Sequence, residues 1–473
     1  MKMGKEKKTQ VDEPIYDARS LGTPKMLVLG VQHLFAMFGA TVLVPILTGL
    51  SVSATLLFAG LATLFMHLVT GRKVPVFLGS SFAFLGGYFS VVASGAELGL
   101  SQAESLPYAC VGVACAGLLY LVLSLICKAF GSKNVMRYFP PVVTGPIIIA
   151  IGLILAPSAI NNCSTNWLIA LTAIVVVIVC NIWGKGMLKI VPILMGVLVS
   201  YLLAAVTGSV DFSGVKEAAW IGLPVQMQNT VFGLLGSGKV NSGLLISSII
   251  MIVPIAFATM MEHVGDISAI GGTIGKNLIE DPGLHRTLIG DGIGTAIAAL
   301  FGAPANTTYG ENTGVLVLTK VYDPKVVRIA AYFAVVLSFC PKFAALVSCM
   351  PTATIGGVSL ILYGMISAVG VRNVVENQVD FTKSRNVIIC ALIMGLALGV
   401  NFSGFLGANI TTAGNNAVGA ISFMIGDMKI GLSGLAIASI VGIVLNAILP
   451  GKDYEFGTDE QGDTAVNFGS RHQ

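Results

Sequence analysis

Long apolar segments follow one another through almost the whole chain, and only short polar or charged connections separate them. A helix needs about 20 apolar residues to cross a bilayer. The pattern therefore predicts an all-α polytopic membrane protein with fourteen segments, of which the third and tenth are short or broken. Their expected ranges are 26–49, 51–70, 75–95, 107–128, 138–157, 166–184, 189–208, 241–265, 286–302, 303–319, 327–349, 352–371, 385–402 and 430–450.

The composition agrees with a membrane location. Hydrophobic residues make up 55% of the chain and charged residues 11%, whereas soluble domains carry about 25% charged residues. Polar tails are expected at 1–24 and 451–473, and no hydrophilic block between them is long enough for a separate soluble domain.

The distribution of Lys and Arg predicts the topology. If both termini are cytoplasmic, fourteen spans place 23 of the 27 basic residues on the inner side. Cytoplasmic loops of membrane proteins carry such an excess of Lys and Arg, so the split favours fourteen spans. The net charge of +4 then reflects topology, and no nucleic-acid partner is expected.

A short motif recurs in the two halves of the chain. Gln32-His33 in the first segment is followed 49 residues after the histidine by the aromatic residue of Ser80-Ser81-Phe82. Glu262-His263 in the eighth segment is followed, 46 residues after its histidine, by the aromatic residue of Thr307-Thr308-Tyr309. Seven helices per half is an odd number, so the two repeats must be inverted. Inverted repeats with interrupted segments indicate a transporter with a binding site near the membrane midplane.

The two interrupted segments are the candidate binding site. Residues 303–319 combine one proline, two glycines, four threonines and Glu311 within an apolar region, and residues 75–84 are rich in Gly and Ser after a proline. Non-helical polar backbone at membrane depth is tolerated where it is buried or lines a cavity. Two alternatives remain open: residues 303–319 could form an ordinary loop, and residues 75–84 could form a helix-packing face.

Ionisable residues in apolar surroundings are candidates for proton transfer. Glu262 and Asp266 have i,i+4 spacing, which places both carboxylates on one helix face, although a solvated helix end would explain them too. His33 lies inside the first segment, where a helix–helix hydrogen bond is an equal alternative. Tyr363 could close a pocket or pack in the core. Asp291 is a further carboxylate without an assigned role.

Motifs of other protein classes are absent from the sequence. No CxxC pair, catalytic triad or HExxH motif occurs, so we expect neither a metal, a cofactor nor an enzyme. Residues 233–240 nearly match a phosphate-binding loop, but the required Ser or Thr does not follow Lys239. An ion gradient is therefore the expected energy source.

These stretches resemble the nucleobase–ascorbate transporter family, also called nucleobase–cation symporter-2, over nearly the whole chain from Gln32 to Leu449. The Glu311-Asn312 pair differs from the Gln-Asn pair typical of the purine and xanthine branch, and this favours a pyrimidine, with uracil first. The motifs that carry the resemblance are residues 32–45, 79–84, 262–265, 281–286 and 306–312.

The resemblance implies two domains and a short antiparallel strand in each of the third and tenth segments. It also implies a location in the cell membrane, with lipid around the helices and a homodimer formed through the gate domain. The expected divisions are a core domain at 25–135 and 241–349, a gate domain at 136–208 and 350–450, and an extracytoplasmic loop at 209–240.

The resemblance further implies roles for individual residues. Glu262 and Glu311 would accept the ring N–H groups of uracil, and the backbone N–H groups of Phe82 and Gly310 would bond its carbonyls. The residues expected to pack around the ring are Ala40, Tyr309 and Tyr363.

Proton coupling is expected to involve Glu262, Glu311, Asp266 and His33, with His33 supporting the site from behind. Some relatives carry histidine where this chain has Asp266, which leaves the proton route open. The predicted function is uracil import by proton symport. The alternatives are a purine or xanthine symporter of the same family and an anion exchanger or channel of the same architecture.

Overall fold

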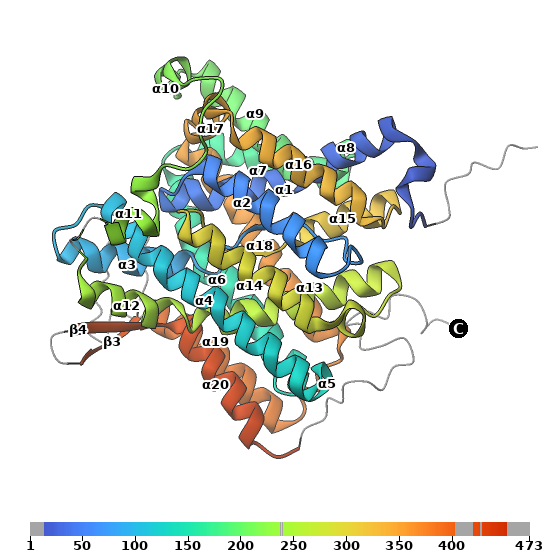
Figure 1. Cartoon of the computed structure of the whole chain (residues 1–473), viewed down its shortest axis with the longest axis vertical. Helices are drawn as coiled ribbons and strands as arrows, with labels where there is room; N and C mark the ends of the chain where they lie inside the picture. The colour runs from blue at the N-terminus through green and yellow to red at the C-terminus, as the bar shows by residue number, and fades with distance from the viewer. Residues whose placement is uncertain (1–13, 237, 239, 403–419, 426–427, 452–473) are drawn as a thin grey trace, which may run out of the picture.

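The computed structural model describes residues 14–236, 238, 240–402, 420–425 and 428–451. Helices dominate this part of the chain (Figure 1). The elements before residue 240 are η1 (Ala18–Leu21), α1 (Thr23–Thr48), α2 (Val52–Val69), β1 (Leu78–Ser80), α3 (Leu85–Glu97), α4 (Gln102–Phe130), α5 (Ser132–Met136), α6 (Pro141–Ser164), α7 (Trp167–Ile182), α8 (Met187–Ile190), α9 (Pro192–Val206), α10 (Ser213–Glu217), η2 (Met227–Asn229) and α11 (Val231–Gly236).

The second part of the chain repeats the alternation of long helices with a short strand. Its elements are α12 (Ser242–Ile252), α13 (Ile255–Ile274), η3 (Ile279–Gly283), α14 (Leu284–Leu300), β2 (Asn306–Thr308), α15 (Gly310–Thr319), α16 (Pro324–Ser338), α17 (Pro341–Ser348), α18 (Thr352–Glu376), α19 (Ser384–Phe402), β3 (Ala420–Ile425), β4 (Met428–Ser433) and α20 (Gly434–Ile448).

Several helices are long and apolar enough to cross a membrane. Among the described residues these are α1, α2, α4, α6, the α12–α13 pair, α18 and α19. An eighth span results if α16 and α17, which meet at 91°, count as one. The helices α7, α9 and α20 are shorter but apolar. The chain is therefore a multi-pass membrane protein, and the full count of fourteen spans stays a prediction.

The expected short strands are present in the third and tenth segments. β1 and β2 pair antiparallel, with Leu78 opposite Thr308 and Ser80 opposite Asn306. The backbone N–H of Tyr309 extends the ladder by donating to the Phe77 carbonyl at 3.0 Å. Each strand leads toward a helix, α3 or α15, so the pairing brings the starts of these two helices together in the interior.

One threonine hydroxyl from a neighbouring helix fastens each strand. Thr63 Oγ1 on α2 accepts from the Leu78 N–H at 2.8 Å, and Thr295 Oγ1 on α14 accepts from the Asn306 N–H at 3.2 Å. Both hydroxyls also lie within hydrogen-bond distance of the carbonyl of the same strand residue. Each half of the chain thus has the same threonine–strand hydrogen bond, which supports the repeat that the sequence suggested. The two threonines lie outside the motif that revealed the repeat.

Two sequence expectations about the helices are wrong. The eighth segment does not end near residue 265, because α13 starts after Pro254 and continues to Ile274, where Gly275 adopts the left-handed conformation. The fourteenth segment does not begin as helix, because β3 and β4 form a second antiparallel hairpin before α20. Glu262 and Asp266 consequently lie in the middle of a helix. The alternative that they belong to a solvated helix end is therefore wrong.

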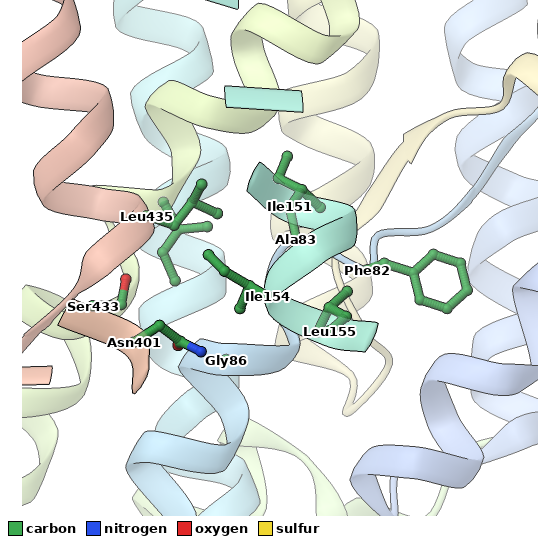
Figure 2. A pocket seen from close by; sticks show the side chains of 10 residues that line it. Phe82, Ala83, Gly86, Ile151, Ile154, Leu155, Asn401, Ser433 and Leu435 are labelled. Carbon is green, nitrogen blue, oxygen red and sulfur yellow. The ribbon is translucent and has the colours of Figure 1, made fainter. Parts of the chain in front are cut away.

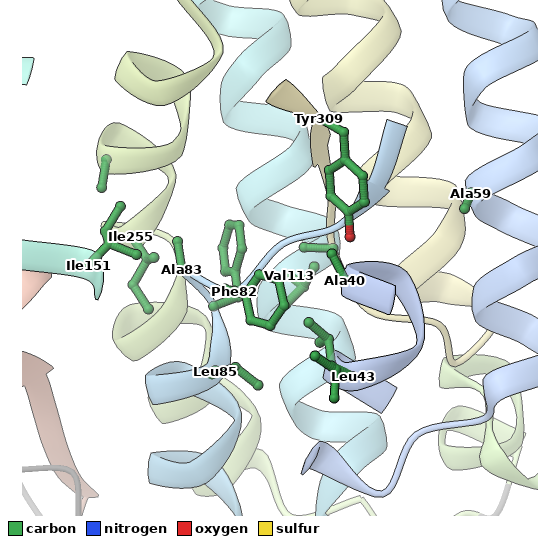
Figure 3. Close-up of a cluster of buried hydrophobic side chains, with 14 of the residues drawn as sticks. Ala40, Leu43, Ala59, Phe82, Ala83, Leu85, Val113, Ile151, Ile255 and Tyr309 are labelled. Carbon is green, nitrogen blue, oxygen red and sulfur yellow. The ribbon is translucent and has the colours of Figure 1, made fainter. Parts of the chain in front are cut away.

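The long helices pack against one another in two sets. The first includes α4 against α14 and α2 against α16, and the second includes α6 against α18 and α19 against α20. Apolar side chains fill the space between the paired strands and the surrounding helices, where Phe82, Ala40 and Tyr309 belong to one continuous buried cluster (Figure 3). The broken segments are thus fixed by a packed core.

Candidate functional site

A cavity of about 350 Å³ lies where β2 and α15 meet α13 and the second set of helices. Both polar groups and apolar side chains contribute to its lining. Residues of both chain halves line it, including Phe82, Glu262, Asp266, Thr307, Thr308, Tyr309, Gly310, Thr313, Asn181, Ile148, Leu362, Lys189 and Arg372. Five residues that the sequence assigned to the site, Phe82, Glu262, Asp266, Tyr309 and Gly310, therefore share this cavity.

The carboxylates of α13 form the acidic wall. Glu262 and Asp266 are one helical turn apart, and both line the cavity while being partly exposed. Partial exposure lets each carboxylate reach a ligand or solvent from a helix that is otherwise buried. The helix can thus present two proton-accepting groups to the same space.

The opposite polar wall is the start of α15. Tyr309 is the N-cap residue and Gly310 the first helical residue. The first N–H groups of a helix have no acceptor within it, and the helix dipole makes this end electropositive. Gly310 lines the cavity, so its N–H can serve a carbonyl acceptor there. Glu311 follows in the first turn, but its side chain lies outside the described structure.

Tyr309 joins the two strands to α1. Its hydroxyl donates to the Ser80 carbonyl at 2.9 Å, and the Ser80 hydroxyl donates to the Thr41 carbonyl at 2.9 Å. Ala40 is fully buried behind this contact, near the Tyr309 hydroxyl (Figure 3). Ala40 does not line the cavity in this structure, and its expected contact with a ligand ring stays a prediction.

Close approach of Tyr309 requires a glycine at position 79, because a Cβ there would overlap the tyrosine ring. We expect Gly79→Ala to cost about 1–3 kcal/mol, the usual effect of overpacking. Gly364→Ala on α18 is the matched control, since nothing lies within 4 Å of its Cβ position. Thermal unfolding in detergent measures both, and equal midpoints for the two variants would contradict the tight contact.

Phe82 separates the cavity from a second, much smaller space. Its ring meets Tyr363 edge-on, with centroids 5.7 Å apart, and in Figure 2 it points away from Ile154. Behind it lies a space of about 20 Å³, enough for one water molecule. Tyr363 is 1% exposed and does not line the cavity in this structure, so its expected packing against a ligand ring stays a prediction.

His33 supports the start of α15 from α1. The Asn312 side-chain amide lies 3.1 Å from His33 Nδ1 and donates to the His33 carbonyl at 3.0 Å. Both residues are buried, and His33 does not line the cavity. The helix–helix hydrogen bond, one of the two interpretations of the sequence, is therefore present, and it fixes the residue that follows Glu311.

His263, the matching histidine of the repeat, holds the other side of the same segment. Its Nδ1 lies 3.0 Å from Thr308 Oγ1 and 3.0 Å from Asp291 Oδ2. Both His263 and Asp291 are fully buried. The sequence flagged Asp291 without a partner, because the two residues come from different helices. The two histidines thus hold the segment from Thr308 to Asn312 at its two ends.

Two cations in the cavity wall were missed by the sequence interpretation. Lys189 of α8 and Arg372 of α18 line it, and Arg372 also pairs with Glu376 at 2.6 Å. The positive-inside rule assigned both residues to the cytoplasmic side, so the sequence interpretation did not connect them with a binding site. Among the described residues, no group of three or more His, Cys, Asp or Glu could hold a metal ion.

Comparison with known proteins identifies the relatives of this chain. It is 37% identical to the uracil permease of Bacillus caldolyticus over 93% of this chain and 96% of that protein. It is 36% identical to the uracil permease of Bacillus subtilis, with 94% and 97% covered. A putative pyrimidine permease of Escherichia coli is also 36% identical, with 83% and 87% covered.

Solved structures with the same fold include anion transporters. The transmembrane domain of the cyanobacterial bicarbonate transporter BicA matches with a TM-score of 0.56 at 15% identity, covering 93% of this chain and all of that domain. The structure of SLC26A9 matches with a TM-score of 0.55 at 11% identity, covering 92% and 66%. Identities this low establish the fold only.

The broken helices around a polar cavity in a multi-pass protein define a membrane transporter, not an enzyme. The chain belongs to the permease family, whose model matches residues 24–404. This confirms the expected nucleobase–ascorbate transporter family.

Proposed function

We propose that this protein imports uracil by proton symport and that the substrate binds in the cavity between α13 and the start of α15. The observation that carries the proposal is the convergence of two α13 carboxylates and a helix N-terminus on one cavity. The uracil permeases among the relatives, similar over nearly their whole length, support uracil as the substrate.

The four proposed ligands suit the hydrogen-bonding pattern of uracil. Uracil is planar and neutral, with two N–H donors and two carbonyl acceptors. Glu262 and Glu311 accept the donors, and the backbone N–H groups of Gly310 and Phe82 bond the carbonyls. A purine or xanthine would present a different edge to the same groups, and the putative pyrimidine permease among the relatives also favours the smaller ring.

Transport follows from movement of one helix set against the other. The core domain, at 25–135 and 241–349, carries the strands and the acidic wall, and the gate domain, at 136–208 and 350–450, supplies apolar side chains and the cations Lys189 and Arg372. The separate packing of α4 on α14 and of α6 on α18 supports this division. We place both termini in the cytoplasm, the loop 209–240 outside, and a homodimer contact on the gate domain.

Proton coupling is assigned to the α13 wall. Protonation of Glu262 or Asp266 changes the charge that faces the substrate, so the two protonation states differ in affinity and in preferred conformation. His33 acts by holding Asn312 next to Glu311. The proton gradient would then influence at which step of the transport cycle uracil is bound and at which it is released.

The test of coupling is Asp266→Asn in proteoliposomes. We expect uracil accumulation driven by an inward proton gradient to fall at least tenfold, because the neutral amide cannot carry the proton. Exchange of internal for external uracil should persist, since it needs no net proton transfer. Equal loss of accumulation and exchange would contradict a coupling role, and unchanged accumulation would contradict it as well.

Lys189 and Arg372 in the cavity wall favour one other candidate, an anion transporter. Their charge would attract an anion, whereas Glu262 and Asp266 would repel it. Uptake of bicarbonate or chloride that competes with uracil would support this alternative.

A further inference from the structure

The segment before α1 is bound to the body of the protein. Ile15 forms a parallel bridge with Val321. Its N–H donates to the Lys320 carbonyl at 2.8 Å, and its carbonyl accepts from the Tyr322 N–H at 2.8 Å. We name residues 14–22 the strap. In Figure 1 the dark-blue start of the described chain lies beside α15.

Tyr16 of the strap touches the ends of two helices. Its hydroxyl donates to the carbonyl of Ile274, the last residue of α13, at 2.9 Å. Lys276 Nζ lies 4.9 Å from the centroid of its ring. The same ring meets Tyr322, just beyond α15, edge-on at 5.6 Å. This one side chain therefore joins the end of α13 to the end of α15.

The strap continues onto the start of α16. The Ala18 N–H donates to Asp323 Oδ2 at 2.8 Å, and Asp323 is the N-cap of α16. Asp17 pairs with Lys325 at 3.2 Å. The Arg19 backbone N–H, and next Lys325, hold the pKa of Asp17 below its usual value, so its carboxylate is charged at neutral pH. The strap thus ties three helix ends together.

The two helices joined by Tyr16 are those that build the polar walls of the cavity. α13 carries Glu262 and Asp266, and α15 begins with Gly310 at the cavity. α15 has ten residues, about 15 Å at 1.5 Å per residue. A short, stiff helix transmits a shift of its far end to its start. Its alignment with α13 therefore depends on the contacts that hold the end near Lys320.

We propose that Tyr16 is a positioning residue, which holds the ends of α13 and α15 in register so that the carboxylates of α13 face the start of α15 at the distance that the substrate requires. The inference rests on the proposed function for its substrate. The alignment of the two helices does not depend on which substrate binds.

Hydrogen exchange provides a test that is independent of the substrate. In Tyr16→Ala we expect amides of peptides covering residues 310–319 to exchange at least fivefold faster than in the wild type. Tyr16→Phe, which keeps the ring contacts and loses the hydroxyl, should give a smaller increase. Arg19→Ala is the matched control, because the Arg19 side chain pairs within the strap, with Asp17 at 3.3 Å, and with no other side chain of the described residues. Unchanged exchange in Tyr16→Ala would overturn the proposal.

Uracil affinity of the same folded samples gives the second readout. We expect Kd to rise about tenfold in Tyr16→Ala and about threefold in Tyr16→Phe, with Arg19→Ala within twofold of the wild type. A lower melting temperature with exchange at 310–319 and Kd both unchanged would mean a purely stabilising strap and would refute positioning. A wild type that fails to bind uracil would instead refute the proposed substrate, while the exchange result still decides the role of Tyr16.

Discussion

Replacing His263 with leucine is expected to lower the free energy of unfolding by about 2–5 kcal/mol, because two buried polar groups, Asp291 and the Thr308 hydroxyl, each lose a partner at about 1–3 kcal/mol per group. His263 Nδ1 lies 3.0 Å from Asp291 Oδ2, and neither side chain is exposed. Among the described residues, the Asp291 carboxylate has no polar partner besides His263. Without His263 the Asp291 side chain would be left without a polar partner inside the helix bundle.

The double variant His263→Leu/Asp291→Leu separates this effect from a simple loss of packing. Replacing both members of a buried pair by apolar residues is often neutral or stabilising, so we expect at least half of the loss to return. The thermal midpoint in detergent reports both variants. A double variant less stable than His263→Leu would show that the pair is not the source of the loss.

Replacing Glu262 with glutamine should weaken uracil binding by about 30- to 150-fold. A hydrogen bond to a charged group contributes about 1.5–3 kcal/mol, and a group left without a partner costs a similar amount, so we take a net loss of about 2–3 kcal/mol. Each 1.4 kcal/mol is a factor of ten in Kd. The amide keeps the shape of the side chain, but it has one acceptor oxygen where the carboxylate has two.

Glu280→Gln is the matched control for this variant. Glu280 carries the same charge, is exposed in η3, and does not line the cavity. Calorimetry should show wild-type affinity for it. If Glu262→Gln binds uracil as tightly as Glu280→Gln does, the acidic wall of α13 is not part of the binding site.

Several features of the fold could be predicted because they leave a local pattern. Gly, Ser and Thr clusters in apolar segments predicted two interrupted segments, the family resemblance implied a strand in each, and β1 and β2 lie there. The end of α13 was predicted too early, at residue 265, because apolar length alone does not locate the cap, which Gly275 makes. The β3–β4 hairpin was missed because a short apolar run reads equally as strand or helix.

The site was predictable as far as residues share a motif. Glu262 and Asp266 share a helix face, and Phe82 with Tyr309 shares a repeat, and all four line the cavity. Contacts between distant segments left no such signal: the partners His263 and Asp291, the threonines Thr63 and Thr295, and the cations Lys189 and Arg372. Sequence spacing also does not encode how deep a residue lies, so it could not show that Phe82 and Tyr309 line the cavity while Ala40 and Tyr363 lie behind them.

The most direct test of the central claim is calorimetric titration of the purified protein with uracil, with xanthine, cytosine and bicarbonate titrated in parallel. The account predicts saturable binding of uracil at one site per chain, no comparable binding of the other three, and loss of the signal in Glu311→Ala. Binding of xanthine or bicarbonate in place of uracil, or uracil binding that Glu311→Ala leaves intact, would contradict it.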